Sequence, residues 1–206
     1  MHVVGAAFAC AVLAQSAAAQ DPNTDPSAVT VIGNDSHARR CINGVSQGDT
    51  SDTVLAECAR GLTNPRLTRG GAVLLHTDRG VAYLRRQQTA EAIADFDAVL
   101  ALEPNNAEAR LNRGTALVIA HQPGAAVAEL TQALSLGVSE PEKAYYNRAA
   151  AREQLGDLRG AYEDYNTALE IRPDWGPANE QLARFARSRR EHLANILAQQ
   201  QQPSSP

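Results

Sequence analysis

The sequence is poor in the residues that build β-sheets. Aromatic residues make up 4% of its 206 residues, with a single Trp, and there are only three Cys. A β-sandwich or β-barrel needs many β-branched and aromatic side chains, whereas Ala-rich segments suit closely packed helices. We therefore expect an all-α fold.

An excess of basic residues is also missing. The formal net charge is −4 and the pI is about 5.7. Nucleic acids and anionic lipids both attract basic surfaces, so we expect neither of them to be the main partner.

Long hydrophobic runs are absent as well. The apolar stretch from Val3 to Ala14 is shorter than the ~20 residues that a membrane-spanning helix needs. It has the length of the hydrophobic region of a signal peptide, and Ala17-Ala18-Ala19 offers a small-x-small cleavage site. We predict a secretory signal over residues 1–19 and no stable membrane insertion after its removal.

Cysteine usage agrees with export from the cytosol. Cys10 lies within the predicted signal, which leaves Cys41 and Cys58. In an oxidising compartment this pair predicts a disulfide, which would contribute about 3 kcal/mol by restricting the unfolded chain. Two unrelated buried thiols are the alternative. No metal site is predicted, because a closed tetrahedral site needs four ligands.

Catalytic motifs are nearly absent. The segment GVSQG (44–48) matches the G-x-S-x-G pattern, in which Ser46 would be a nucleophile on a strand-to-helix turn. The residues before it do not form a strand pattern, so a serine hydrolase remains only an alternative. We predict that the protein is not an enzyme and needs no cofactor.

The most informative feature is an internal repeat. Gly80, Gly114 and Ala149 are 34 and 35 residues apart. Two further sets follow the same spacing: a small residue at Ala92, Ala126 and Ala161, and a bulky residue at Phe96, Leu130 and Tyr165. A period of about 34 residues predicts a helix–turn–helix solenoid, in which each hairpin buries its apolar face against its neighbours.

The motifs within this period resemble those of the tetratricopeptide repeat, in the variant whose first helix carries Asn-Arg-Gly. They occur as LNRG (111–114), as YNRA (146–149) and in altered form as TDRG (77–80), while Pro104 and Pro173 occupy the terminal proline position. The resemblance implies a right-handed superhelical solenoid. A Cys pair upstream of such repeats is similar to bacterial secreted members, which implies a periplasmic location.

The expected organisation follows from these segments. A solenoid end needs a cap with a polar outer face, which the helical pattern after Trp175 can supply. The expected order is a signal peptide (1–19), a disordered linker (20–37), a Cys-containing leader similar to a degenerate repeat (38–72), three repeats (73–106, 107–141 and 142–175), a capping helix (176–199) and a disordered tail (200–206).

A constant offset of sixteen residues separates each motif Arg from an acid on the following helix. The pairs are Arg79 with Asp95, Arg113 with Glu129 and Arg148 with Asp164. We predict that each pair forms a half-buried ion pair across its hairpin and fixes the register. Three solvated charges on exposed faces are the alternative.

The resemblance also implies a concave groove lined by the first helices. Its expected lining is Val81, Leu84, Leu111, Asn112, Thr115, Ile119, Lys143, Tyr146 and Asn147. Leu111, Ile119 and Tyr146 are the expected anchors for a helix or extended segment of a protein partner. Since Lys143 is the one suitable cation, we do not expect a clamp for a terminal carboxylate. Coverage of these residues by the C-terminal helix, or by a second copy in a homo-oligomer, is the alternative. The predicted function is that of an adaptor or scaffold.

Overall fold

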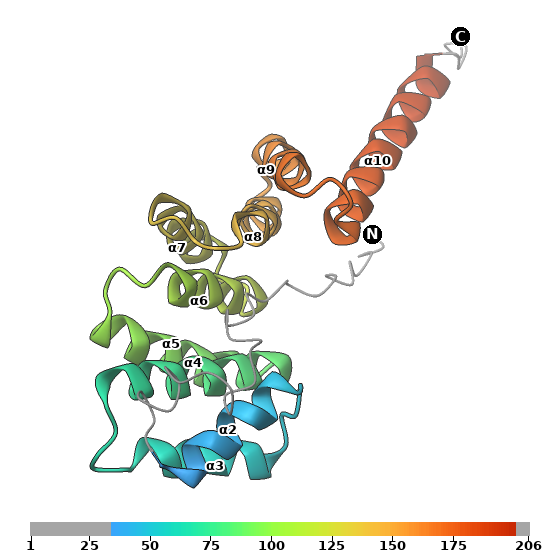
Figure 1. Cartoon of the computed structure of the whole chain (residues 1–206). Helices are drawn as coiled ribbons and strands as arrows, with labels where there is room; N and C mark the ends of the chain where they lie inside the picture. The colour runs from blue at the N-terminus through green and yellow to red at the C-terminus, as the bar shows by residue number, and fades with distance from the viewer. Residues whose placement is uncertain (1–33, 201–206) are drawn as a thin grey trace.

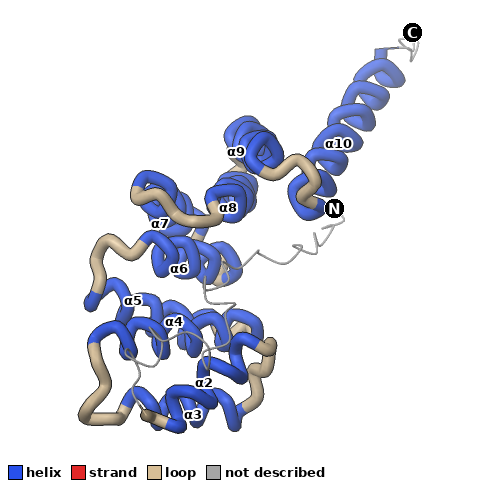
Figure 2. The backbone as a smooth tube through the Cα atoms, viewed as in Figure 1, coloured by secondary structure: helices blue, strands red, loops and turns tan. Residues whose placement is uncertain are grey.

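The computed structural model describes residues 34–200, and this part of the chain is a succession of helices without strands (Figure 2). No helix in it is both long and apolar enough to span a membrane. The helices are α2 (Ser36–Ser46), α3 (Asp52–Leu62), α4 (Arg69–Arg85), α5 (Thr89–Leu102), α6 (Ala107–Ile119), α7 (Pro123–Ser135), α8 (Pro141–Gln154), α9 (Leu158–Ile171) and α10 (Gly176–Gln200).

The helices form a stack of hairpins. The leader hairpin, α2–α3, lies at one end, followed by α4–α5, α6–α7 and α8–α9 (Figure 1). Helix α10 packs on α9 at the other end and then projects away from the stack. The prediction of an all-α superhelical solenoid with three repeat hairpins and a terminal helix is confirmed.

The helix starts have local causes. The side chains of Thr68, Asn106 and Asp157 accept hydrogen bonds from backbone N–H groups of the first turns of α4, α6 and α9. Helices α7 and α8 begin instead with Pro123 and Pro141, whose fixed φ suits the first helical position. These signals are all readable in the sequence, which is why the helix order is predictable.

Each repeat hairpin closes where a small residue meets a bulky one. A Cβ added at Gly80 would lie 2.8 Å from the ring of Phe96, and one added at Gly114 would lie 2.6 Å from Leu130. In the third repeat Ala149 and Tyr165 share one core cluster. A larger residue at these points would force the paired helices apart.

The core is divided along the stack. One cluster joins the leader hairpin to α4 and α5, a second centres on α6 and α7, and a third joins α8 and α9 to Trp175 and Ala178. Each cluster thus contains residues of one hairpin and residues of a helix next to it. This is expected when a hairpin cannot bury its apolar face alone.

The leader differs from its predicted bounds. Helix α2 begins at Ser36, inside the segment predicted as a linker, because the Asp35 carboxylate accepts hydrogen bonds from the N–H groups of His37 and Ala38. Helix α4 begins at Arg69, four residues before the predicted start of the first repeat at residue 73. The signal peptide (1–19), the linker up to residue 33 and residues 201–206 of the predicted tail lie outside the described residues.

Candidate partner-binding surface

The predicted charge pair of the first repeat joins α4 to α5. The guanidinium of Arg79 donates two hydrogen bonds to the Asp95 carboxylate, at 2.9 and 2.7 Å, and Nδ1 of His76 lies 2.7 Å from the same carboxylate. Burial alone would raise the pKa of Asp95, but the hydrogen bonds from His76 and Arg79 outweigh it and lower that pKa. The carboxylate is only 3% exposed, so it acts as a buried, ionised link between the two helices.

The other two pairs form as well. Arg113 contacts Glu129 at 2.9 Å, and Arg148 contacts Asp164 at 2.8 Å. Arg113 also reaches Asp97 on α5 at 2.6 Å, which ties the second repeat to the first. The predicted pairing across all three hairpins is confirmed, and the alternative of three solvated charges is wrong.

Sequence reasoning missed a third member of each pair, three residues before the motif Arg. His76 contacts Asp95, Arg110 contacts Glu129 at 3.1 Å, and the ring of Tyr145 lies 5.2 Å from the Arg148 guanidinium. The signal was available, because residues three apart on a helix share a face.

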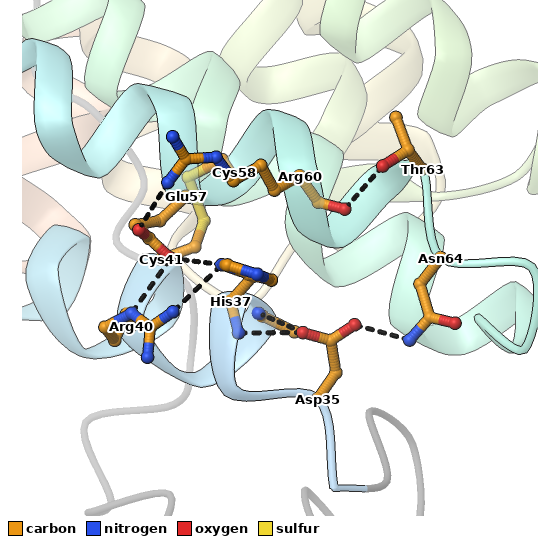
Figure 3. Close-up of polar contacts among 10 residues, drawn as sticks. Asp35, His37, Arg40, Cys41, Glu57, Cys58, Arg60, Thr63 and Asn64 are labelled. Atoms are coloured by element: carbon orange, nitrogen blue, oxygen red, sulfur yellow. Dashed lines mark hydrogen bonds and ion pairs between the residues drawn. A yellow bond between two sulfur atoms is a disulfide. The ribbon is translucent and has the colours of Figure 1, made fainter.

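The leader hairpin carries the same cluster (Figure 3). Glu57 of α3 is held by His37 at 2.7 Å, by Arg40 at 2.9 Å and by Arg60 at 3.0 Å. His37 and Arg40 are three residues apart, as His76 and Arg79 are in the first repeat. The hydrogen bond from His37 is the main cause that lowers the pKa of Glu57.

The two cysteines follow this cluster directly. Cys41 comes after Arg40, Cys58 comes after Glu57, and the structure joins the two sulfurs, with a Cα–Cα distance of 4.8 Å (Figure 3). Both residues are fully buried. They occupy the place that Gly80 and Phe96 occupy in the first repeat, each directly after the Arg or the acid of the pair.

The predicted groove lining is mostly inaccessible. Eight of its residues are buried, and their exposed fractions do not exceed 7%. They are Val81, Leu84, Leu111, Asn112, Thr115, Lys143, Tyr146 and Asn147. Ile119 on α6 is the one residue of this set that is partly exposed. Thr77 on α4 and Ala150 on α8, which the resemblance also places near the groove, are partly exposed as well. Leu111 and Tyr146 are therefore packing residues, and a partner cannot use their side chains as anchors.

The C-terminal segment explains the burial of Tyr146. The Tyr146 ring packs edge-on against Trp175 at 5.1 Å and Tyr165 at 5.3 Å between ring centroids. Burial raises the pKa of the Tyr146 phenol, which also forms a hydrogen bond with Gln181 of α10. Coverage by the C-terminal helix was the alternative reading of the sequence, and it holds at this end of the stack.

A polar residue also recurs inside the first helices. Asn112 and Asn147 occupy equivalent positions and are at most 1% exposed. The Asn147 amide donates to the Thr115 hydroxyl of the preceding repeat at 2.8 Å, whereas Oδ1 of Asn112 has no hydrogen-bond partner within the described residues. The residue equivalent to Thr115 in the first repeat is Val81, which has no hydroxyl.

The remaining predictions concern cations and catalysis. Nζ of Lys143 lies 2.6 Å from Glu140 and is buried, so it cannot serve an incoming carboxylate. Ser46 ends helix α2, and its hydroxyl donates to the Asn43 carbonyl of that helix. A helix rather than a strand leads into Ser46, so the nucleophile geometry is not formed. Among residues 34–200 no cluster of His, Cys, Asp and Glu could hold a metal ion.

Comparison with known families agrees with the hairpin geometry. Two family models described as tetratricopeptide repeat match residues 73–106 and 142–174. Two segments of the chain therefore match the tetratricopeptide repeat. The α6–α7 hairpin lies between the two matched segments and has the same small-to-bulky contact and the same ion pair.

Three similar proteins place this finding in context. RNA polymerase II-associated protein 3 of Xenopus tropicalis is 35% identical over 98 residues, which are 48% of this chain and 15% of the relative. The second tetratricopeptide domain of human RPAP3, solved in complex with the HSP70 peptide SGPTIEEVD, has a TM-score of 0.52 and 26% identity. That match covers 57% of this chain and 97% of the solved chain.

The third is MamA from Desulfovibrio magneticus RS-1, with a TM-score of 0.62 and 19% identity. The match covers 84% of this chain and 99% of the MamA chain, and it shows a likeness of fold alone. The chain spans only 15% to 18% of the length of the curated relatives that it matches.

Proposed function

We propose that the protein is a non-enzymatic adaptor of the cell envelope that holds a segment of another protein against the concave side of its solenoid. The observation that supports this most directly is the repeat architecture, because similar domains bind peptides: a tetratricopeptide domain of human RPAP3 binds an HSP70 peptide. A rigid stack of hairpins offers an extended surface without a catalytic group.

The accessible part of the concave side is smaller than the predicted lining, of which Ile119 stays partly exposed. Thr77 on α4, Ile119 on α6 and Ala150 on α8 are each partly exposed. These side chains are small or apolar, and the nearby Lys143 is already paired with Glu140. The surface suits the backbone and apolar side chains of an extended segment and does not favour an acidic chain terminus like that of the RPAP3 peptide.

The proposed location in the cell envelope rests on two features. The apolar run Val3–Ala14 with its small-residue cleavage site is typical of exported proteins. The buried Cys41–Cys58 pair is placed so that a disulfide can form, and such bonds persist in oxidising compartments. We therefore propose export to the periplasm and a lasting disulfide in the native protein.

The test is an affinity pull-down from cell-envelope extract with the protein and two variants. Thr77→Arg combined with Ala150→Arg places charge on the concave side. Ala94→Arg combined with Ala128→Arg places the same charge on exposed second-helix positions and is the matched control. We expect one protein to be retained by the native form and the control, with at least a tenfold loss for the concave variant.

Equal recovery by all three forms would refute concave binding. Light scattering on the same samples distinguishes self-association from binding of another protein. A mass that rises with concentration for the native form, and is lower for the concave variant, would identify the retained partner as a second copy.

A further inference from the structure

Helix α10 takes the position of a first helix, and no second helix pairs with it among residues 34–200. Helices α4, α6 and α8 each pack along the second helix that follows them, but no described helix follows α10. Its sequence keeps the register of a first helix: Ala178 is fully buried like Ala144, 34 residues earlier, and Gln181 stands where Asn147 stands in the third repeat.

The face of α10 that would receive a second helix is open. Ala183 lies 34 residues after Ala149, at the position where each repeat places its small residue against a bulky one. Gly80, Gly114 and Ala149 are all buried by that contact, whereas Ala183 and the neighbouring Ala186 are exposed. We call this surface, formed by Ala183, Ala186, Arg187 and Arg190, the α10 seat.

Two apolar side chains of α9 are also exposed at this end of the stack. Leu158 is 54% exposed and Tyr162 is 49% exposed, and the Tyr162 ring lies 6.2 Å from the ring of Phe185 on α10. The residues equivalent to Tyr162 in the preceding repeats, Ile93 and Val127, are partly buried and packed against core clusters. An apolar surface of this kind, next to an unfilled helix position, marks an interaction site.

Charge decides what can occupy the seat. Ala183, Arg187 and Arg190 are spaced as i, i+4 and i+7, so they share one face of α10. Arg187 and Arg190 are exposed and form no ion pair within the described residues. Leu182 takes the position of the motif Arg in α10, so Arg187 and Arg190 supply the positive charge of the seat from other positions, and acids on a partner helix would pair with them.

We propose that the α10 seat binds an acidic amphipathic helix of another protein, which takes the place of a fourth second helix. A second copy of α10 does not suit the seat, because Arg187 and Arg190 would face the same residues of the partner. The acidic second helices of the chain itself are already packed in their own hairpins. This site is distinct from the concave surface and its partner, so it adds to the proposed function.

The probe is a synthetic peptide with the sequence of residues 88–104, which spans α5 and carries Glu91, Asp95, Asp97 and Glu103 but no basic residue. A second peptide replaces these four acids with Gln and Asn. Binding to the full chain is measured by fluorescence anisotropy. We expect the acidic peptide to bind at least tenfold more tightly than the neutral one, with binding that weakens as salt is added.

Three variants locate the binding. Ala183→Trp fills the seat, and Arg187→Glu with Arg190→Glu reverses its charge; each should weaken binding of the acidic peptide at least tenfold. Ala128→Trp places the same bulk on an exposed position of α7 and should leave binding unchanged. Circular dichroism and a thermal melt check that each variant remains folded, because Ala183 is a surface residue whose replacement should not disturb the core.

Several results would overturn the proposal. These are no measurable binding of the acidic peptide, equal binding of the neutral peptide, or binding that survives both seat variants, as it would if the peptide exchanged with α5 in the first repeat. A dimer found by sedimentation and dissolved by Ala183→Trp would assign the seat to a second copy instead. None of these measurements depends on Thr77 or Ala150, so failure here is separable from failure of concave binding.

Discussion

The leader hairpin and the first repeat tie their two helices together with the same ionic arrangement. In the leader Arg40 contacts Glu57, and in the first repeat Arg79 contacts Asp95, each with a His three residues before the Arg. The two acids differ in exposure and in offset from the Arg, which is seventeen residues in the leader and sixteen in the repeat. The similarity supports the interpretation of the leader as a degenerate repeat.

The two hairpins differ in the contact next to that ion pair. The first repeat packs Gly80 against the Phe96 ring, whereas the leader joins Cys41 to Cys58. The leader helices are short, eleven residues each, and within residues 34–200 the helix that packs on the leader hairpin is α4. A covalent link can therefore stabilise the hairpin at the end of the stack, whereas packing against neighbouring hairpins stabilises those in the middle.

The largest expected effect comes from removing the apolar contact. Phe96→Ala deletes a fully buried ring and should lower the free energy of unfolding by about 4 kcal/mol, because the cavity cannot collapse between two helices. Urea unfolding followed by circular dichroism measures the change. Tyr162→Ala, which removes an exposed aromatic residue on α9, is the control. A loss for Phe96→Ala no larger than that of the control would mean that the ring does not close the hairpin.

Reduction of the leader disulfide comes next. Opening the Cys41–Cys58 link, which spans 17 residues, should lower the free energy of unfolding by about 3 kcal/mol, because the unfolded chain regains its freedom. Urea unfolding with and without a reductant measures the difference. The Cys41→Ala, Cys58→Ala double variant should show no response to reductant, and Cys10→Ser should respond like the native chain. Indifference of the native chain to reductant would contradict a covalent role for the pair.

The smallest of the three effects concerns the buried acid and depends on pH. The pKa of Asp95 in the folded protein lies below its ordinary value of 3.8, so its stabilisation is complete above that value and is lost as the pH falls below it. Asp95→Asn should cost about 2 kcal/mol at pH 7, since hydrogen bonds to charged groups contribute that much. The difference in free energy of unfolding between the native protein and the variant should become smaller below about pH 4. Chemical denaturation at pH 7 and pH 3 measures it. A difference independent of pH would show that Asp95 does not act through its charge.

Much of the fold was predictable because its rules are local. The period of 34 residues, the caps and the starting prolines place the repeat helices, and the offset of sixteen residues identifies the ion pairs, which are confirmed. The third members of these clusters, such as Tyr145, were missed although the i, i+3 spacing pointed to them. The start of the leader was missed because the segment before it is rich in turn-forming residues, and Asp35 is one of them.

The candidate surface was predicted less well, for a reason that Leu111 and Tyr146 illustrate. Both lie on first helices, where the resemblance implies a groove, and both are buried. Helix periodicity gives the direction of a side chain relative to its own helix, but it does not show what a neighbouring hairpin or the C-terminal helix places in front of it. Trp175 and Gln181 cover Tyr146 through contacts that no repeat motif encodes.

The sequence by itself determined the hairpins, their small-to-bulky contacts and their ion pairs, because these depend on helix periodicity and on partners within one hairpin. Tertiary structure alone decided which residues a partner can reach. Superhelical stacking buries Leu111, and the packing of α10 on α9 buries Tyr146 while leaving Ala183 and Tyr162 open at the end of the stack. The exposure of a side chain depends on every helix that packs nearby, and in this chain the contacts that decide it are between hairpins rather than within one hairpin.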